Sequence, residues 1–235
     1  MISVETDPQN TEAVSIPWSA RDTWIGAGLL FFVMLGLIVG IYFLPKLDMS
    51  LILVGSELLL MLPVWWLAVR KYGASWRMLG LRKFTPVALG LGCGLMILSW
   101  GFNLVYSLFL ALFDVRAQPD FAPIFAETTS PWMIFLAGVL IAPIVEEIIF
   151  RGFIFAGFKA RYGWVKAAIF SSGLFALIHI QPLAILGIFV MGMIFAYLYQ
   201  YSGSIWPGIV MHMSTNLLAL SAAYLMARFP ELITM

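Results

Sequence analysis

Charge is what this sequence has least of. Only 11% of its 235 residues are charged, whereas 62% are apolar and the mean hydropathy is +0.98. A soluble domain is typically about 25% charged and roughly 45–50% apolar. The composition therefore excludes a soluble globular protein and a disordered one. It predicts a multi-pass membrane protein, whose helices are surrounded by lipid.

Net charge, cysteine and histidine are also scarce. The net charge of +1 provides no large field that could recruit a polyanion, so we expect no nucleic-acid partner. A single cysteine, Cys93, excludes an internal disulfide and a cysteine-based metal cluster. Only two histidines occur, His179 and His212, which makes each of them a candidate for a functional role.

The N-terminal stretch differs from a signal peptide, which needs a basic start and a short apolar run. Residues 1–22 instead combine four acids with one base, Arg21. We therefore predict a polar tail over residues 1–22, followed by a single transmembrane helical domain over residues 23–235. No internal repeat or second domain is evident in the sequence.

Seven apolar stretches are long enough, or nearly so, to cross the hydrocarbon layer, which takes about 20 residues of helix. The pattern thus predicts an all-α, polytopic membrane helix bundle of about seven spans. Six to eight spans are compatible with it, because the fifth and sixth stretches are short. The predicted spans cover residues 24–44, 51–69, 86–113, 131–158, 165–180, 183–199 and 205–226.

The distribution of lysine and arginine among the loops predicts the orientation of the bundle. The loop over residues 70–83 carries five basic residues, and the loop after the fourth span carries Lys159, Arg161 and Lys166. Both loops fall on the same side if there are seven spans. Because basic loops stay inside, we expect a cell-membrane protein with these loops and the N-terminus in the cytoplasm. Residues 114–130 are then a polar connector on the outer face.

Several polar side chains lie inside the predicted spans, where ionisable groups are costly and usually face a cavity or a partner. These side chains are Glu57, Glu146, Glu147, Arg151, His179, His212, Asn103 and Asn216. Such a concentration indicates a functional site within the membrane. Glu57 could reach the same cavity at a similar depth, although we favour a structural hydrogen bond for it.

The two adjacent glutamates are predicted to differ in role. Arg151 lies four residues after Glu147, which is the spacing at which helical side chains meet, so this pair can neutralise itself. Glu146 has no such partner and is left free for chemistry. Pro143 removes a backbone hydrogen bond just before it and can kink the helix there. The alternative is a structural ion cluster that joins helices.

Each histidine has a companion one helical turn away. Phe175 precedes His179 by four residues, and Asn216 follows His212 by four. A lone intramembrane histidine often serves only as an interhelical hydrogen-bonding group. The repeated pattern, on helices that could flank the acidic one, favours a common site formed by Glu146, His179, His212 and Asn216.

This set of residues suits the activation of water. A glutamate can take the proton, while histidine and asparagine can donate hydrogen bonds to an oxyanion. A zinc site formed by Glu146, His179 and His212 is equally compatible with the residue types. Ligand duty for Glu146 would, however, leave the paired Glu147 as the base. We therefore favour a site without a metal cofactor and keep Zn²⁺ as the alternative.

Four motifs in order resemble those of the CPBP family, the type II CAAX prenyl endopeptidases and bacteriocin-processing (Abi) proteins. The first is E-E-x-x-x-R, over residues 146–151. It is followed by F-x-x-x-H at Phe175–His179, F-x-x-G at Phe189–Gly192 and H-x-x-x-N at His212–Asn216. The resemblance covers residues 131–217, whereas the first three spans carry no motif.

The resemblance implies an all-helical intramembrane endopeptidase, often named a metalloprotease, with a cavity open toward the cytosol. It implies that Glu146 activates water with help from His179, that His212 and Asn216 hold the oxyanion, and that Glu147 and Arg151 support them. Phe175 enters as a supporting residue through its motif. The partners implied are membrane lipid and a peptide or protein substrate, with or without a lipid modification.

Two other functions remain compatible with the sequence. A non-catalytic membrane immunity or partner protein could keep the same residues for folding, although the intact four-part motif favours the enzyme. A proton-coupled transporter would use intramembrane acids as a relay. That function predicts matching broken helices in two halves of the chain, whereas here the polar residues concentrate in the second half.

Overall fold

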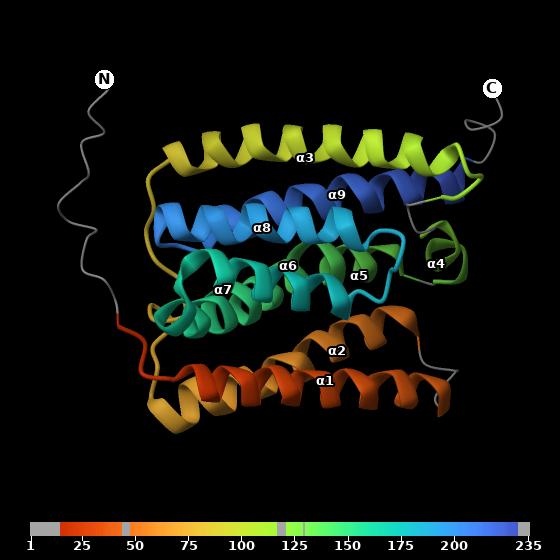
Figure 1. Ribbon diagram of the computed structural model, residues 1–235. Helices are drawn as coiled ribbons and strands as arrows, with labels where there is room; N and C mark the ends of the chain where they lie inside the picture. The colour runs from red at the N-terminus through yellow and green to blue at the C-terminus, as the bar shows by residue number, and fades with distance from the viewer. Residues whose placement is uncertain (1–14, 44–47, 117–120, 129, 230–235) are drawn as a thin grey trace, which may run out of the picture.

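The architecture was taken from a computed structural model, which describes residues 15–43, 48–116, 121–128 and 130–229. Within these ranges the regular secondary structure is entirely helical, as predicted, and the long helices lie side by side in one bundle (Figure 1). Three segments are π-helical and carry the letter η. In chain order the helices are α1 Ala20–Phe43, α2 Met49–Val64, η2 Trp65–Arg70, α3 Val87–Ala111, α4 Ala122–Glu127, α5 Pro131–Phe135, η3 Leu136–Ile141, α6 Ala142–Glu147, η4 Ile148–Phe155, α7 Ala156–Ile178, α8 Ile185–Ser202 and α9 Trp206–Arg228.

Six helices in the described part of the chain are long and apolar enough to cross a membrane, one fewer than the seven expected. The difference arises because the predicted fourth and fifth spans form one continuous stretch, Pro131–Ile178, of 48 residues. That stretch reverses direction at Gly163, where φ is 79° and ψ is 165°. Glycine adopts such a left-handed conformation without steric cost, so one residue replaces the expected loop.

The two arms of this stretch pack against each other as an antiparallel hairpin. The hydroxyl of Ser171 donates to the carbonyl of Phe150 at 2.6 Å. Nearer the turn, the rings of Phe158 and Phe170 lie 5.8 Å apart. The arms correspond to the fourth and fifth predicted spans. We call residues 131–178 the central hairpin.

The central hairpin lies in the middle of the bundle (Figure 1). Helices α1 and α2 form a pair on one side of it, and α1 packs against α7. Helices α8 and α9 cover the other side, and α3 lies beyond them, packed against both. The glutamate pair, Arg151 and Phe175 lie on this hairpin and are therefore flanked on both sides by other helices.

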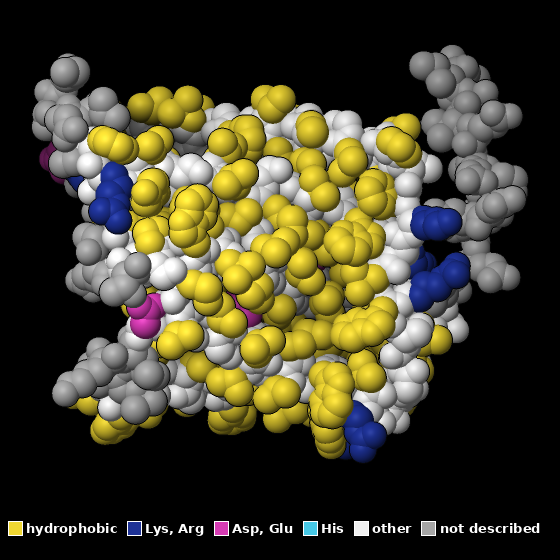
Figure 2. All heavy atoms as spheres, turned by 180° about the vertical axis from the view of Figure 1, so that it is seen from behind, with side chains coloured by type: hydrophobic (Ala, Val, Ile, Leu, Met, Phe, Trp, Pro, Cys, Tyr) yellow, Lys and Arg dark blue, Asp and Glu magenta, His cyan; other side chains and the backbone are white. Residues whose placement is uncertain are grey.

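The ends of the bundle agree with the predicted parity of the loops. The α2–α3 connection and the turn of the central hairpin lie at the end where α1 begins, whereas α9 ends at the opposite end (Figure 1). Figure 2 shows hydrophobic side chains over the middle of one face, with lysine and arginine confined to its edges. This distribution is typical of a protein with an apolar belt in the membrane.

The predicted N-terminal tail is too long, because its last residues are anchored to the bundle. Helix α1 begins at Ala20, and Trp18 stacks on Phe153 and donates to its carbonyl at 3.2 Å. Ser19 and Asp22 cap the helix reciprocally through backbone and side-chain hydrogen bonds. Residues 1–14 lie outside the described part.

Asp22, which the prediction placed in the solvated tail, is buried and its charge is paired. Lys71 donates to it at 2.6 Å and the Tyr72 hydroxyl at 2.8 Å. The hydrogen bond to Asp22 raises the pKa of Lys71. The pair ties the start of α1 to the end of η2, which explains why the sequence alone placed this acid wrongly.

The expected polar connector over residues 114–130 contains a short helix, α4. Its Phe125 is buried between the rings of Phe135 on the central hairpin and Tyr224 on α9, at centroid distances of 5.6 and 5.4 Å. Residues 117–120 and 129 of the connector lie outside the described part. The connector is therefore at least partly packed onto the end of the bundle.

Candidate active site

The helix that carries the glutamate pair departs from α-helical geometry on both sides. Helix α6 lies between the π-helical segments η3 and η4. The N–H of Ala142 donates to the carbonyl of Ala137, five residues back. In this register the carbonyl of Gly138 would accept from residue 143, which is Pro143 and has no N–H. Gly138 thus has a carbonyl without a helical partner.

Asn216 of α9 supplies that partner. Its Nδ2 donates to the carbonyl of Gly138 at 2.8 Å, across 78 positions of sequence. Pro143 therefore lies just after the π-helical segment η3, and the carbonyl that it leaves free fixes the side chain of a predicted site residue. One N–H of the Asn216 amide remains for another acceptor.

Glu147 and Arg151 form the predicted i,i+4 pair. Nη1 of Arg151 donates to Oε1 of Glu147 at 2.8 Å, and both side chains are fully buried. Nη2 donates to the carbonyl of Gly192 on α8 at 2.9 Å. The guanidinium also lies over the rings of Phe175 and Phe195, at 4.5 and 5.2 Å. Arg151 thus compensates the charge of Glu147 and joins two helices.

Two glycines allow this close packing. A Cβ built on Gly192 would come within 2.9 Å of the Ser172 Cβ and 3.2 Å of Nη2 of Arg151. A Cβ on Gly208 of α9 would come within 2.9 Å of Oε2 of Glu147. These contacts give a physical reason for the glycine of the F-x-x-G motif.

Glu146 is buried and lies next to His212. Nε2 of His212 is 3.8 Å from Oε2 of Glu146, and Nδ1 of the same ring is 3.6 Å from Oε1 of Glu147. The imidazole therefore bridges the two carboxylates, at distances slightly beyond a hydrogen bond. Oε2 of both glutamates and Nδ1 of His212 have no hydrogen-bond partner among the described residues. Such atoms are available to a reactant.

His179 is the C-terminal cap of α7 and is partly buried. Its Nδ1 lies 2.7 Å from the carbonyl of Phe175, which can only accept, so Nδ1 carries the proton. The lone pair of the neutral ring is then on Nε2. Ile180, which follows, has φ of 52°, a costly conformation for a β-branched residue. The helix therefore ends sharply at His179.

Phe175 connects the two histidines. Its ring centroid is 4.8 Å from that of His179 and 5.7 Å from that of His212. The structure thus brings Glu146, Glu147, Arg151 and His212 into direct proximity. Phe175 links His179 to this group, whereas the contact of Asn216 is to the Gly138 carbonyl, eight residues before Glu146.

Glu57 and Asn103 are the predicted intramembrane polar residues outside the motifs. Glu57 of α2 interacts electrostatically with Glu146, and its Oε2 has no hydrogen-bond partner in the described part of the chain. The structural hydrogen bond expected for it is therefore not found at that atom. Asn103 donates to the carbonyl of Ser99 in its own helix and packs against Gly187, so it serves the α3–α8 contact.

Sequence reasoning missed two contributors to the site. The carbonyl of Gly192 accepts from Arg151, and the ring of Phe195 lies 5.2 Å from that of His212. Gly192 was part of a motif, but no sequence signal indicated that its backbone would be used. Phe195 follows it by three residues, on the same face of α8, which is the only available hint.

A metal would need at least three suitable side chains in reach of one point. Among the described residues, no three histidine, cysteine, aspartate or glutamate side chains are arranged in that way. Glu146 and His212 approach each other to 3.8 Å, whereas no described contact brings Nε2 of His179, the nitrogen with the free lone pair, to either of them. The zinc set considered above does not assemble in this arrangement, and we derive no step through a metal.

Comparison with known proteins identifies the motif-bearing region. Residues 128–218 match the family model described as type II CAAX prenyl endopeptidase Rce1-like. The Bacillus subtilis (strain 168) protein YdiL, whose name describes a membrane peptidase, is 35% identical over 86 residues. These are 37% of this chain and 35% of YdiL, so the chain spans about a third of that relative. No solved structure matches. Residues 128–218 thus resemble the type II CAAX prenyl endopeptidases, and the resemblance indicated by the motifs is confirmed over this part of the chain.

Proposed function

We propose that the protein is an intramembrane endopeptidase that hydrolyses a peptide bond in a membrane-associated substrate. The observation that carries the proposal is the difference between the adjacent glutamates. Glu147 is bound to Arg151, whereas Oε2 of Glu146 is buried beside His212 without a hydrogen-bond partner in the described residues. A buried carboxylate of this kind can serve as a general base.

In the proposed reaction, Glu146 takes a proton from water, assisted by the Nε2 lone pair of His179. The water oxygen bonds to the scissile carbonyl carbon, and the carbonyl oxygen becomes an oxyanion. His212 and the remaining N–H of Asn216 donate hydrogen bonds to it. When the intermediate collapses, the C–N bond breaks and the leaving amine takes the proton held by Glu146. The products are a carboxylic acid and an amine.

Glu147 and Arg151 act by holding the other groups in place. The pair fixes α6 against α8 through the Gly192 carbonyl and supports the ring of Phe175. His212 lies between the two carboxylates, so the position of Glu147 also sets that of the imidazole. These residues therefore position catalytic groups and do not contact the reacting atoms.

The metal-free mechanism needs its own test. Protein purified without chelators or a nickel column is analysed for zinc, and cleavage is measured before and after chelation. We expect substoichiometric zinc and unchanged cleavage. The metal-free mechanism would be wrong if the protein held stoichiometric zinc, if removing the zinc abolished cleavage and if returning it restored cleavage.

We also propose that the end of the bundle bearing the basic loops faces the cytoplasm of the cell membrane. This end holds the start of α1, the α2–α3 connection and the turn of the central hairpin. The positive-inside rule supports this orientation. Lys83 and Asp114 are exposed and flank α3 at opposite ends. Replacing each of them by cysteine and labelling the cysteine from one side of sealed cells would test the orientation.

The decisive experiment compares wild type and Glu146→Gln on a library of membrane-anchored peptides, with isoprenylated and unmodified members. Because glutamine cannot take the proton, cleavage should fall by roughly 10²–10⁴-fold with an unchanged melting temperature. Asp114→Asn makes the same change outside the site and should leave cleavage unaltered. Near-normal cleavage by Glu146→Gln contradicts the mechanism, and no cleavage by wild type favours a non-catalytic partner protein.

A further inference from the structure

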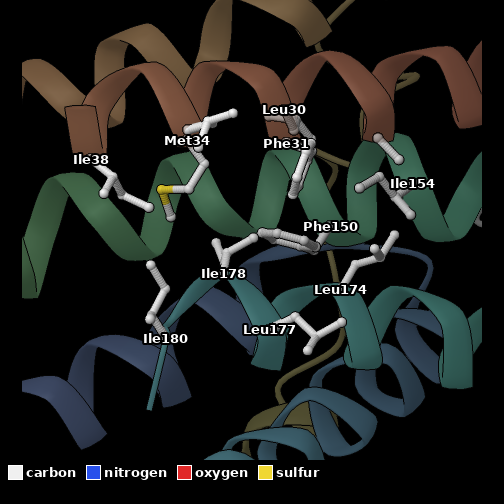
Figure 3. A pocket seen from close by; sticks show the side chains of 12 residues that line it. Leu30, Phe31, Met34, Ile38, Phe150, Ile154, Leu174, Leu177, Ile178 and Ile180 are labelled. Carbon is white, nitrogen blue, oxygen red and sulfur yellow. The ribbon is translucent and has the colours of Figure 1, made fainter. Parts of the chain in front are cut away.

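A second feature of the membrane region lies away from the glutamates. An apolar groove of about 330 Å³ runs between α1 and the central hairpin. In Figure 3, Leu30, Met34 and Ile38 reach into it from α1, while Ile154 and Leu174 face them from the hairpin. Ile180, with its left-handed backbone, closes one end. The volume is within the usual range for a small-molecule site, about 300–1,000 Å³.

The chemistry of the lining selects a hydrocarbon. All twelve lining side chains are apolar, so a peptide in the groove would leave its N–H and C=O groups unpaired at several kcal/mol each. A hydrocarbon chain has no such cost. The groove is also continuous with the lipid-facing surface, because Phe31 and Leu35 line it and are 63% and 47% exposed.

The length of the groove matches one leaflet of a bilayer. Its α1 lining extends from Ala27 to Ile38, which corresponds to about 16 Å at the helical rise of about 1.5 Å per residue. Half of a hydrocarbon core about 30 Å thick is about 15 Å. One extended acyl chain anchored at a single membrane surface would therefore fill it.

Positive charge lies at the end of the groove where α1 begins. Trp24 donates to the hydroxyl of Tyr162 at 3.3 Å and thereby joins α1 to the turn of the central hairpin. The Arg161 guanidinium lies over the Tyr162 ring, and Arg21, Arg161 and Lys166 are exposed there. Tryptophan and tyrosine are typical of the headgroup level, and exposed basic residues beside them suit an anionic headgroup.

We propose that the groove between α1 and the central hairpin binds one acyl chain of an anionic phospholipid. Its headgroup lies at Arg21, Arg161 and Lys166, and its chain follows α1 from Ala27 to Ile38. The inference goes beyond the peptidase function and does not depend on it. The bound chain contacts Phe150, whose ring lies 5.3 Å from that of Phe175 at the candidate active site.

The first test locates the chain. The full-length protein is placed in nanodiscs of phosphatidylglycerol and phosphatidylcholine that contain a trace of phosphatidylglycerol with a mid-chain diazirine. After irradiation, adducts are mapped by mass spectrometry. We expect them to concentrate on Met34, Leu177 and Ile178. Equal labelling of the lipid-facing residues of α3, such as Leu104 and Val105, would show general lipid contact and overturn the proposal.

A variant with a blocked groove provides the matched comparison. Ala27→Phe fills the groove and should reduce labelling there about tenfold, because excluding two methylene groups removes about that much affinity. Ala219→Phe makes the same change on the exposed surface of α9 and should leave it unchanged. Undiminished labelling in Ala27→Phe, with its melting temperature unaltered, would contradict binding in the groove.

The second test addresses the headgroup and the source of the chain. Phosphatidylglycerol should label the groove several-fold more than phosphatidylcholine carrying the same diazirine, and Arg161→Gln with Lys166→Gln should remove the difference. Arg116→Gln is the control, because Arg116 follows the C-terminal end of α3, at the end of the bundle opposite to the start of α1. Equal labelling by both lipids, or displacement of the label by an isoprenylated peptide, overturns the proposal. Repeating the labelling in Glu146→Gln separates this result from that of the peptidase assay.

Discussion

The central hairpin and α1 are both apolar enough to span a membrane, but they are buried to very different extents. In the most apolar window of the hairpin, 44% of residues are buried inside the protein, compared with 11% for α1. Their hydropathies are almost equal, at 2.3 and 2.4. Hydropathy thus reports contact with an apolar environment and does not distinguish lipid from protein.

The polar residues do distinguish the two regions. The hairpin buries Glu146, Glu147 and Arg151, whereas the buried acid of α1, Asp22, lies in its first turn and is bound to Lys71. A charge deep in the membrane requires protein around it, so the hairpin must be enclosed. Substitutions in the hairpin should therefore have large effects and those in α1 small ones.

The largest effect on stability is expected for Arg151→Ala. Removing the guanidinium leaves Glu147 as an uncompensated charge in low dielectric and the Gly192 carbonyl without its donor, at a cost of about 3–5 kcal/mol. We expect a lower melting temperature in detergent and a lower folded yield. The double variant Glu147→Gln with Arg151→Met removes both charges and should be more stable than either single variant. Wild-type stability in both single variants would contradict the pairing.

Two glycine-to-alanine changes compare the regions directly. In Gly152→Ala of the hairpin, the new Cβ would meet the backbone carbonyl of Leu79, which cannot rotate away. We expect a loss of about 3 kcal/mol, the upper end for overpacking. Gly36→Ala on α1 meets no atom and faces lipid. It should change stability by at most about 0.5 kcal/mol. Similar melting temperatures for the two variants would refute the contrast.

Asn216→Ala tests the link between α9 and the irregular helix. The change removes the donor to the Gly138 carbonyl, which Pro143 cannot replace, and should cost about 1–2 kcal/mol. It should also reduce cleavage, because the oxyanion loses a donor. Asn103→Ala removes an asparagine that bonds within its own helix and should leave cleavage unchanged. Equal cleavage in both variants would assign Asn216 a structural role only.

The helical fold, the loop parity and the Glu147–Arg151 pair could be predicted from the sequence, because each depends on local periodicity or spacing. The separation of the fourth and fifth spans was also predicted, from the basic residues between them, but not that Gly163 alone would form the turn within one continuous helical stretch. The start of α1 was also missed, because it depends on contacts between residues that are distant in sequence. Asp22 appears solvated in the sequence, and only the fold places Lys71 and Tyr72 beside it.

Of the candidate site, the sequence predicted the residues but not how they are joined. The i+4 spacings of His179 and His212 indicated a shared face on each helix. Nothing in these spacings indicated that Phe175 would connect the two rings, or that His212 would lie between both carboxylates. Contacts of this kind join helices distant in sequence, so they depend on packing angles that periodicity does not encode.

Because π-helical segments flank α6, the number of residues in them determines the direction in which the glutamate side chains point. Each residue of an α-helix turns the chain by about 100° and advances it about 1.5 Å. Deleting one residue from η3, where side chains largely face other helices or lipid, would rotate Glu146 and Glu147 together relative to the N-terminal half of the helix. Their carboxylates would then no longer face His212. The angular phase of the glutamate pair is thus set by the length of the preceding segment, independently of which apolar residues compose it.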